Sequence, residues 1–341
     1  MKVLLAEDSR TVIAYLEAIF RQTADVTLLP VAHDGASAVE AACALRPDLI
    51  LMDLMLPVLD GIEAIRQIMA LVPCPIVVLS EHVATPQGDR TFEALAAGAV
   101  DVLAKPSGVE PKQAAEFAER LIAMVRLMVT ARVVRRPART GPASAGSSSP
   151  WRGRFELVAI GASVGGPQLL WELLRQLPAP FPLPIVICQH ILAGFEQGLA
   201  AWLSRTRHAV RVAAPGDRPQ AGRVLLAPSE RHLVLRNGRC EYVAPAERSL
   251  QRQMTPSVDV LFESLAESIG RRCVALLLTG MGEDGARGLH ELRKRGALTV
   301  AQNGESCVVD GMPAAARALG AAELELTPAG MVKLLLQVGT P

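Results

Sequence analysis

Ser163 lies in a glycine-rich turn that follows an apolar run and precedes an expected helix. With Gly161 and Gly165 it forms the pattern G-x-S-x-G, in which small neighbours let the chain turn sharply and expose a hydroxyl beside helix amides. A glycine-rich turn can equally pack closely against a neighbour or cradle a phosphate. The turn therefore predicts a nucleophile only where a base and a carboxylate accompany it.

Two other polar residues follow apolar runs in the same part of the chain. His190 ends the run from Leu183 to Gln189, and Asp284 lies just beyond the run from Cys273 to Thr279. Fully apolar runs are typical of buried parallel strands, so we expect these two residues and Ser163 at one sheet edge. A serine needs an imidazole to take its proton and a carboxylate to orient that imidazole. The chain order Ser, His, Asp does not predict an α/β-hydrolase, in which the order is Ser, Asp, His.

Other interpretations of this region have less support. Cys188 stands two residues before His190, but a thiol within an apolar strand is expected to be buried. The turn lacks the G-x-G-x-x-G pattern of a dinucleotide site, and the sequence has no H-E-x-x-H motif or cysteine pair for zinc. We therefore expect no cofactor in this part of the chain.

Acidic residues and a lysine stand at strand ends in the first 125 residues. Apolar runs alternate there with amphipathic helices, which predicts a doubly wound parallel sheet; the runs are Lys2 to Ala6, Val26 to Val31, Asp48 to Met52, Pro75 to Ser80 and Val100 to Ala104. Function gathers at the carboxyl ends of such strands, which here carry Glu7, Asp8, Asp53, Ser80 and Lys105. Carboxylates of this kind suit Mg²⁺, and Lys105 can pair with Asp53 or with a phosphoryl group.

The region from Arg132 to Arg154 is rich in arginine, glycine, serine and proline. Such a composition cannot bury a core, so we predict a flexible linker over residues 126–153 that separates a domain of residues 1–125 from one of residues 154–341. A hydrophobic content of 50% in 341 residues suffices for two cores. The net charge of +1 and the lack of a basic recognition helix after the linker argue against nucleic acid as a partner.

The sequence also indicates in which cellular compartment the protein is found. Its apolar stretches are interrupted well short of a membrane span, and Met1 to Ala6 runs directly into Glu7 and Asp8 without a secretory signal. Its six cysteines are scattered, which is typical of reduced core thiols. We expect a cytoplasmic protein without direct membrane insertion.

The residues at the strand ends of the first domain resemble those of response-regulator receiver domains. This resemblance implies a flavodoxin-like fold in which Asp53 accepts a phosphoryl group and binds Mg²⁺ together with Glu7 and Asp8. Ser80 would be the switch hydroxyl, and Lys105 would contact the phosphate. An aspartyl phosphate forms by attack of a carboxylate, with the metal neutralising charge in the transition state.

Later segments closely resemble the chemotaxis-type protein-glutamate methylesterase (CheB) family. They are Gly161 to Gly166, Cys188 to His190, Ala227 to Ser229 with His232, Pro256 to Phe262, Thr279 to Ala286, and Gln302 to Cys307 with Gly311 to Pro313. The resemblance implies an α/β domain with a mainly parallel sheet, in which Ser163 is the nucleophile, His190 the general base and acid, and Asp284 the orienting carboxylate. The Met281 backbone amide would donate to the oxyanion.

The family resemblance also implies a function. Members remove methyl groups from glutamate esters on chemoreceptors, and many deamidate specific glutamines. We therefore expect methylated chemoreceptors as substrates, a chemotaxis-type histidine kinase as phosphodonor, and a receiver that covers the catalytic cleft until it is phosphorylated. The alternatives are a receiver-controlled hydrolase of another ester and a noncatalytic interaction protein.

The sequence departs from the family patterns at two positions. Val102 replaces the usual aromatic switch residue of receivers, and Val164 replaces a threonine common in the family.

Overall fold

The computed structural model describes residues 1–80, 88–105, 111–128, 153–244 and 254–339. The chain divides into two compact units, Met1–Arg135 and Arg136–Pro341, and each contains its own parallel sheet. Most of the linker predicted from the sequence, residues 129–152, lies outside the described residues.

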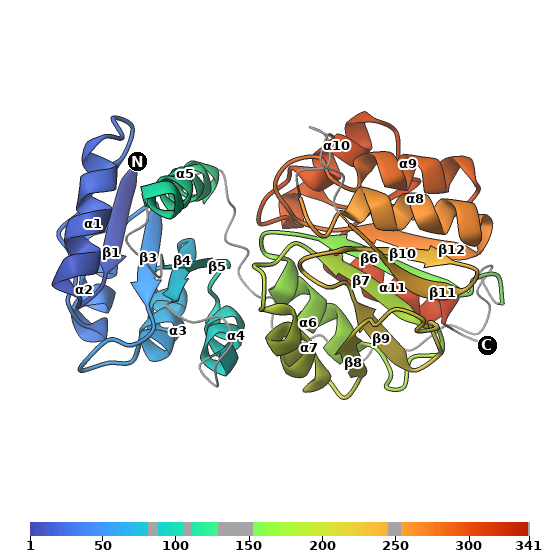
Figure 1. The fold of residues 1–341 in the computed structure, drawn as a ribbon. Helices are drawn as coiled ribbons and strands as arrows, with labels where there is room; N and C mark the ends of the chain where they lie inside the picture. The colour runs from blue at the N-terminus through green and yellow to red at the C-terminus, as the bar shows by residue number, and fades with distance from the viewer. Residues whose placement is uncertain (81–87, 106–110, 129–152, 245–253, 340–341) are drawn as a thin grey trace. The chain divides into compact units, whose positions relative to one another are not determined.

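The N-terminal unit is a five-stranded sheet with helices on both faces (Figure 1). The strand order is β2-β1-β3-β4-β5 and all pairings are parallel, which is the doubly wound architecture predicted from the sequence. In chain order the elements are β1 (Lys2–Ala6), α1 (Arg10–Arg21), β2 (Thr27–Leu28), α2 (Gly35–Leu45), β3 (Leu49–Asp53), α3 (Gly61–Leu71), β4 (Ile76–Ser80), α4 (Gly88–Ala97), β5 (Asp101–Ala104) and α5 (Pro111–Met128).

The second strand is shorter than the sequence predicted. Of the expected strand from Val26 to Val31, only Thr27–Leu28 forms β2, which pairs with β1 at the sheet edge. The Thr27 and Leu29 amides donate to Met1 and Val3, so the next donor in this alternation would be Val31, but the Ala32 amide donates to Leu5 instead. One extra residue therefore interrupts the regular pairing after Leu29. Pairing resumes only at an isolated bridge between Ala6 and Ala32.

The C-terminal unit contains a seven-stranded sheet of order β14-β13-β12-β6-β7-β9-β8, in which all pairings are parallel. With the separate antiparallel pair of β10 and β11, it matches the mainly parallel α/β domain that was predicted. Helices α8, α9 and α10 pack on one face, whereas α6, α7 and α11 pack on the other (Figure 1).

The elements of this unit begin after the linker. They are β6 (Leu157–Ala162), α6 (Gly166–Gln176), β7 (Ile185–Gln189), α7 (Glu196–Ser204), β8 (Ala209–Val212), β9 (Arg223–Leu226), β10 (His232–Arg236), β11 (Arg239–Val243), α8 (Val258–Ser268), β12 (Cys273–Leu277), α9 (Ala286–Lys294), β13 (Leu298–Gln302), α10 (Met312–Ala318), β14 (Leu324–Leu326) and α11 (Pro328–Val338). Short 3-10 turns, Gly270–Arg272 and Gly304–Ser306, precede β12 and follow β13.

Three neighbouring strands at the centre of this sheet position the candidate catalytic residues. Every residue of β6, β7 and β12 is buried, as the apolar runs predicted. The register pairs Leu277 with Gly161 and Ala162 with Gln189, so the carboxyl ends of the three strands are level. Residues that follow these strands therefore emerge at one edge of the sheet.

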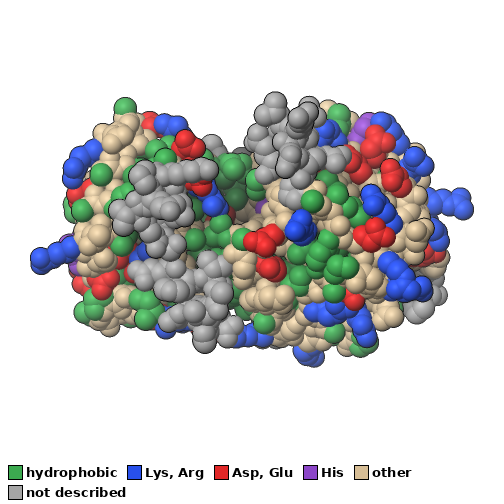
Figure 2. Space-filling view, in the orientation of Figure 1, with side chains coloured by type: hydrophobic (Ala, Val, Ile, Leu, Met, Phe, Trp, Pro, Cys, Tyr) green, Lys and Arg blue, Asp and Glu red, His purple; other side chains and the backbone are tan. Residues whose placement is uncertain are grey.

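The surface carries both signs of charge. In Figure 2 acidic and basic side chains are interspersed on both units, in keeping with the formal net charge of +1. Among the described residues, no helix has the length and apolar character needed to cross a membrane. All six cysteines are unpaired thiols, and five of them are buried.

Candidate active sites

The first candidate site is an acidic cluster at the carboxyl end of the N-terminal sheet. Glu7 and Asp8 follow β1, and Asp53 ends β3, the neighbouring strand. One carboxylate oxygen from each of the three residues lies within 4.8 Å of the others. Three converging hard oxygen donors fit a Mg²⁺ ion, which takes a few carboxylates and keeps several waters.

Lys105 neutralises part of this cluster. Its Nζ lies 2.7 Å from Glu7 Oε2 and 3.0 Å from Asp53 Oδ2. Burial alone would lower the pKa of Lys105, but the bonds to the two carboxylates outweigh it and raise that pKa. Burial raises the pKa of Glu7, repulsion from Asp53 adds to this effect, and the bond to Lys105 partly offsets it. Three carboxylates and one lysine leave an excess of negative charge for a cation to balance.

The remaining residues predicted for this site lie on β4 and β5. Ser80 ends β4, and its carbonyl oxygen accepts a hydrogen bond of 2.7 Å from the Lys105 amide. Val102 is half-buried in β5. The structure thus places Glu7, Asp8, Asp53, Ser80 and Lys105 together at the carboxyl end of one sheet.

The second candidate site begins with the turn at Ser163, between β6 and α6. A Cβ at Gly161 would lie 2.3 Å from a Val258 methyl carbon, and one at Gly166 would lie 2.2 Å from the Gln189 side-chain oxygen. Gly165 has a φ of 76°, which glycine adopts without strain. The glycines therefore allow a tight strand-to-helix turn in which Ser163 is only 6% exposed.

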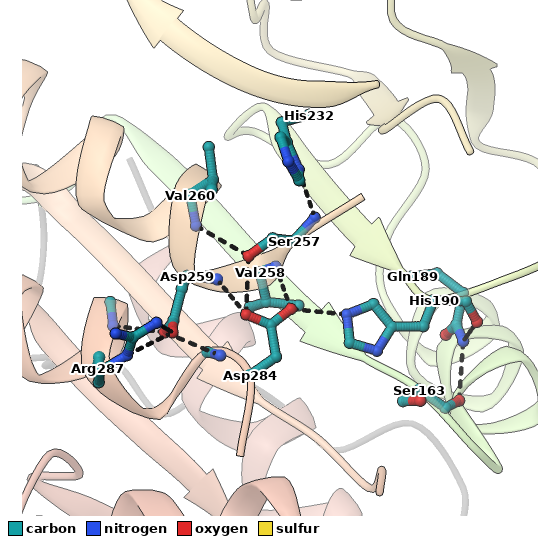
Figure 3. A network of polar contacts seen from close by, with 12 residues as sticks. Ser163, Gln189, His190, His232, Ser257, Val258, Asp259, Val260, Asp284 and Arg287 are labelled. Carbon is teal, nitrogen blue, oxygen red and sulfur yellow. Dashed lines mark hydrogen bonds and ion pairs between the residues drawn. The ribbon is translucent and has the colours of Figure 1, made fainter. Parts of the chain in front are cut away.

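His190 and Asp284 meet beside this turn. His190 follows β7, and its amide donates to the Ala162 carbonyl at 2.9 Å. The imidazole Nε2 lies 2.8 Å from Asp284 Oδ2, and both side chains are largely buried. In Figure 3 the imidazole is seen between Asp284 and Ser163. The second ring nitrogen, Nδ1, has no hydrogen-bond partner among the described residues.

Ser163 and His190 are not joined by a hydrogen bond in the described part of the chain. Catalytic hydrogen bonds are often long in unliganded enzymes and tighten in the substrate complex. Because Nε2 faces Asp284, Nδ1 is the nitrogen that can accept the Ser163 proton.

The loop after β12 approaches the nucleophile closely. A Cβ at Gly280 would lie 2.6 Å from Ser163 Cβ. The Gly280 amide donates to Val309 O, and its carbonyl accepts from the Gly311 and Met312 amides, each at 3.0 Å. These bonds fix the backbone that leads into Met281, whose own side chain is 45% exposed. The Met281 amide makes no hydrogen bond within the described residues, as a donor reserved for an oxyanion requires.

Comparisons with known proteins identify the family of this chain. The model of the CheB methylesterase family matches residues 158–335, and that of the response regulator receiver domain matches residues 3–115. The chain belongs to the CheB methylesterase family. This confirms the resemblance found in the sequence motifs.

Individual relatives extend the match to nearly the whole chain. Protein-glutamate methylesterase/protein-glutamine glutaminase 4 of Geobacter metallireducens is 39% identical over 98% of this chain and 98% of its own. Enzyme 1 of the same name in Cupriavidus pinatubonensis is 42% identical over 96% of this chain and 94% of its own. The crystal structure of the Thermotoga maritima CheB methylesterase catalytic domain, 33% identical, superposes with a TM-score of 0.50 and covers 54% of this chain and 98% of that domain.

The surroundings of Asp284 in this CheB-family chain were not predicted from the sequence. Its carboxylate lies at the N-terminus of α8, where Oδ1 accepts from Ser257 Oγ at 2.8 Å and the Asp259 amide at 3.0 Å (Figure 3). Oδ2 accepts from the Val258 amide at 2.7 Å, as well as from His190. Burial alone would raise the pKa of Asp284, but the bonds to His190 and the helix amides outweigh it and lower that pKa. A serine before an apolar run is a helix-start signal that could have located this N-terminus.

The structure also shows what two neighbours of His190 do. Gln189 Nε2 donates to the carbonyl oxygens of both Ser163 and His190, each at 2.8 Å, and so ties the ends of β6 and β7 together. Burial and the nearby charge of Asp284 hold the pKa of the Cys188 thiol well above its usual range. Cys188 therefore stays protonated, as expected of a core thiol rather than a nucleophile.

Proposed function

We propose that this chain is a phosphorylation-controlled serine esterase that hydrolyses glutamate methyl esters on chemoreceptors and releases methanol. Relatives that match almost its full length carry the names methylesterase and glutaminase. This favours the assignment over a hydrolase of another ester and over a noncatalytic interaction protein. The observation that carries it is the buried His190–Asp284 pair beside the Ser163 turn.

Ser163 Oγ attacks the carbonyl carbon of the methylated glutamate while His190 Nδ1 takes the hydroxyl proton. The charge that appears on the imidazolium is stabilised by Asp284, 2.8 Å from Nε2. The Met281 amide donates to the tetrahedral oxyanion. When this intermediate collapses, the carbon–oxygen bond to the methoxy group breaks, and methanol leaves with the proton from His190.

The acyl-enzyme on Ser163 is then cleaved by water. His190 removes a proton from the water as its oxygen attacks, and it returns that proton to Ser163 Oγ when the acyl bond breaks. The product is the glutamate carboxylate. With a glutamine substrate, ammonia replaces methanol as the first leaving group and the same acyl-enzyme follows, which accounts for deamidation.

The receiver site regulates the esterase activity. The Asp53 carboxylate attacks the phosphorus of a phosphohistidine on a chemotaxis-type kinase, and the histidine nitrogen leaves. Glu7, Asp8 and Asp53 would hold a Mg²⁺ ion, which when bound offsets the negative charge of the phosphoryl oxygens. Lys105, 3.0 Å from Asp53, provides a second positive charge at the same place.

Methanol release from methylated receptor tests the catalytic assignment. Replacing Ser163→Ala in the full-length chain should lower the initial rate by about 10⁴-fold or more, because no other group forms the acyl-enzyme. Ser204→Ala is the matched control, since within the described residues its hydroxyl bonds only to backbone carbonyls on α7 and at Val210. A folded Ser163→Ala protein that demethylates receptor at the wild-type rate would contradict the proposal.

A further inference from the structure

The hydroxyl of Ser257 has two partners at the start of α8. Its oxygen accepts from the Val260 amide at 3.3 Å, which is the usual helix N-cap contact. It also lies 2.8 Å from Asp284 Oδ1 (Figure 3). Because Asp284 is ionised and only accepts, the single proton of Ser257 must point at the carboxylate. Ser257 is 2% exposed, so water does not compete for this bond.

The position of Ser257 is itself fixed from the opposite side. Its amide donates to His232 Nδ1 at 3.1 Å, and His232 begins β10. A ring nitrogen that accepts this bond carries no proton, which places the ring proton on Nε2. Ser257 thus bridges a buried histidine and the carboxylate that faces His190.

We propose that Ser257 is a positioning residue of the reaction: its hydroxyl donates to Asp284 Oδ1 and so limits how strongly Asp284, whose Oδ2 faces His190, stabilises the imidazolium. The proposal rests on the proposed roles of Ser163, His190 and Asp284. A hydroxyl that donates to a carboxylate spreads its negative charge and makes it less basic. Without that donor Asp284 becomes more basic, so the protonated form of His190 is favoured and the base is lost at a higher pH.

The other ionisable groups near Asp284 keep their contacts when the hydroxyl is removed. Asp259 Oδ1 accepts from the Gly285 and Gly288 amides, and its Oδ2 lies 2.9 Å from Arg287 Nη2. His232 binds the Ser257 backbone, and Cys188 stays protonated because burial and the charge of Asp284 raise its pKa. A change in the pH profile of Ser257 variants therefore reports on Asp284 and His190.

The experiment uses the unphosphorylated full-length chain and a fluorophosphonate probe that reacts with an activated serine. The labelling rate is measured from pH 5 to 9 in the wild type, Ser257→Ala and Ser257→Gly. We expect the acid midpoint of both variants to rise by about half a pH unit, since only part of the lost hydrogen bond to the charged carboxylate passes through Asp284 to His190. Glycine is an adequate N-cap, so Ser257→Gly keeps α8 intact if the alanine variant does not fold.

The controls distinguish a failure of the Ser257 proposal from a failure of the proposed function. Thr327→Ala removes a comparable cap, at the start of α11, and should lower stability without moving the midpoint. Ser163→Ala should abolish labelling, and labelling that persists there refutes the proposed function itself. If Ser163→Ala is unreactive but both Ser257 variants keep the wild-type midpoint or a lower one, only the positioning role is refuted.

Discussion

The two carboxylates at the centres of the two sites have opposite surroundings. Asp284 faces a histidine and receives hydrogen bonds from helix amides, so it can stabilise the positive charge that we propose forms on His190. Asp53 shares one lysine with Glu7 and lies close to Asp8. That cluster already has too much negative charge, which is why it suits a divalent cation and then a phosphoryl transfer.

Replacing Asp53→Asn should abolish labelling of the chain by a small phosphodonor, because an amide cannot attack phosphorus as a carboxylate does. Asp48→Asn is the matched control: this acid lies just before the opposite end of the same strand, where it binds the Lys2 amide. A chelator should stop labelling of the wild type as well. Equal labelling of the Asp53→Asn and wild-type chains would exclude Asp53 as the acceptor.

Replacing Lys105→Met should destabilise the N-terminal unit by about 3 kcal/mol at pH 7, because it leaves buried carboxylates without their partner. Burial already raises the pKa of Glu7, and loss of Lys105 raises it further. An acid with a raised folded-state pKa destabilises only when it is ionised, so the effect should shrink as the pH falls toward the ordinary value of 4.5.

Amide hydrogen exchange of peptides from β1 and β3 measures the stability of the N-terminal unit alone. Comparing the wild type with Lys105→Met at pH 7 and at pH 5 gives the destabilisation at each pH. The control Arg66→Met breaks an exposed pair with Glu63 and should change stability by less than about 1 kcal/mol. A destabilisation by Lys105→Met that is the same at both pH values would show that Glu7 is not the group responsible.

The N-terminus of each of the helices α8 and α9 is capped by a carboxylate from the region of the other helix. Asp284, just before α9, accepts the first amides of α8, whereas Asp259 in the first turn of α8 accepts the Gly285 and Gly288 amides of α9. Each helix therefore fixes the acid that stabilises the other helix N-terminus. This arrangement requires close contact, and Gly288 permits it: a Cβ there would lie 2.8 Å from the Asp259 carbonyl oxygen.

Replacing Gly288→Ala should lower stability by about 2 kcal/mol and reduce methanol release, since the backbone of α8 must move and Asp259 and Asp284 move with it. Gly330→Ala is the control in another helix, where the added carbon meets its neighbours at an ordinary 3.4–3.5 Å. That variant should be as stable as the wild type or slightly more stable. Thermal unfolding and initial rates measure both effects, and a Gly288→Ala enzyme with unchanged values would contradict the close-contact argument.

At the scale of the whole molecule, the chain joins two compact units, each of which has its own sheet and its own site. The sequence between them is rich in glycine, serine and proline. A tether of such composition keeps linked domains at a high effective concentration, so even a weak contact is populated. We expect phosphorylation to act by weakening such a contact, and a change of only a few kcal/mol would shift the populations greatly.

We expect a fragment of residues 154–341 to hydrolyse receptor methyl esters faster than the unphosphorylated full-length chain, and to ignore phosphodonor. The catalytic domain of the Thermotoga maritima relative was crystallised as a separate domain, and it covers 54% of this chain. Matched initial rates of methanol release, with and without phosphodonor, make the comparison. If the folded fragment is no faster, the receiver does not inhibit the esterase and instead acts by delivering it to its substrate.

The sequence by itself determined the two α/β domains and the residues at their strand ends. Apolar runs that alternate with helices specify parallel sheets, and in such sheets the residues after neighbouring strands must share an edge. This is why Ser163, His190 and Asp284 were predicted together without any knowledge of contacts, although their catalytic roles remain proposals. The family motifs then specified the substrate class, which the relatives support.

Only the tertiary structure decided how these side chains are oriented. It shows that Nε2 of His190 faces Asp284, that Ser257 binds the other carboxylate oxygen, and that Asp259 caps the neighbouring helix. These contacts join segments about 25 residues or more apart in the chain, and they depend on rotamers and helix packing that periodicity does not encode. The shortened β2 has the same kind of cause, because an edge strand is held by one neighbour and its hydrogen bonds to β1 go out of step after Leu29, where Ala32 rather than Val31 donates to Leu5.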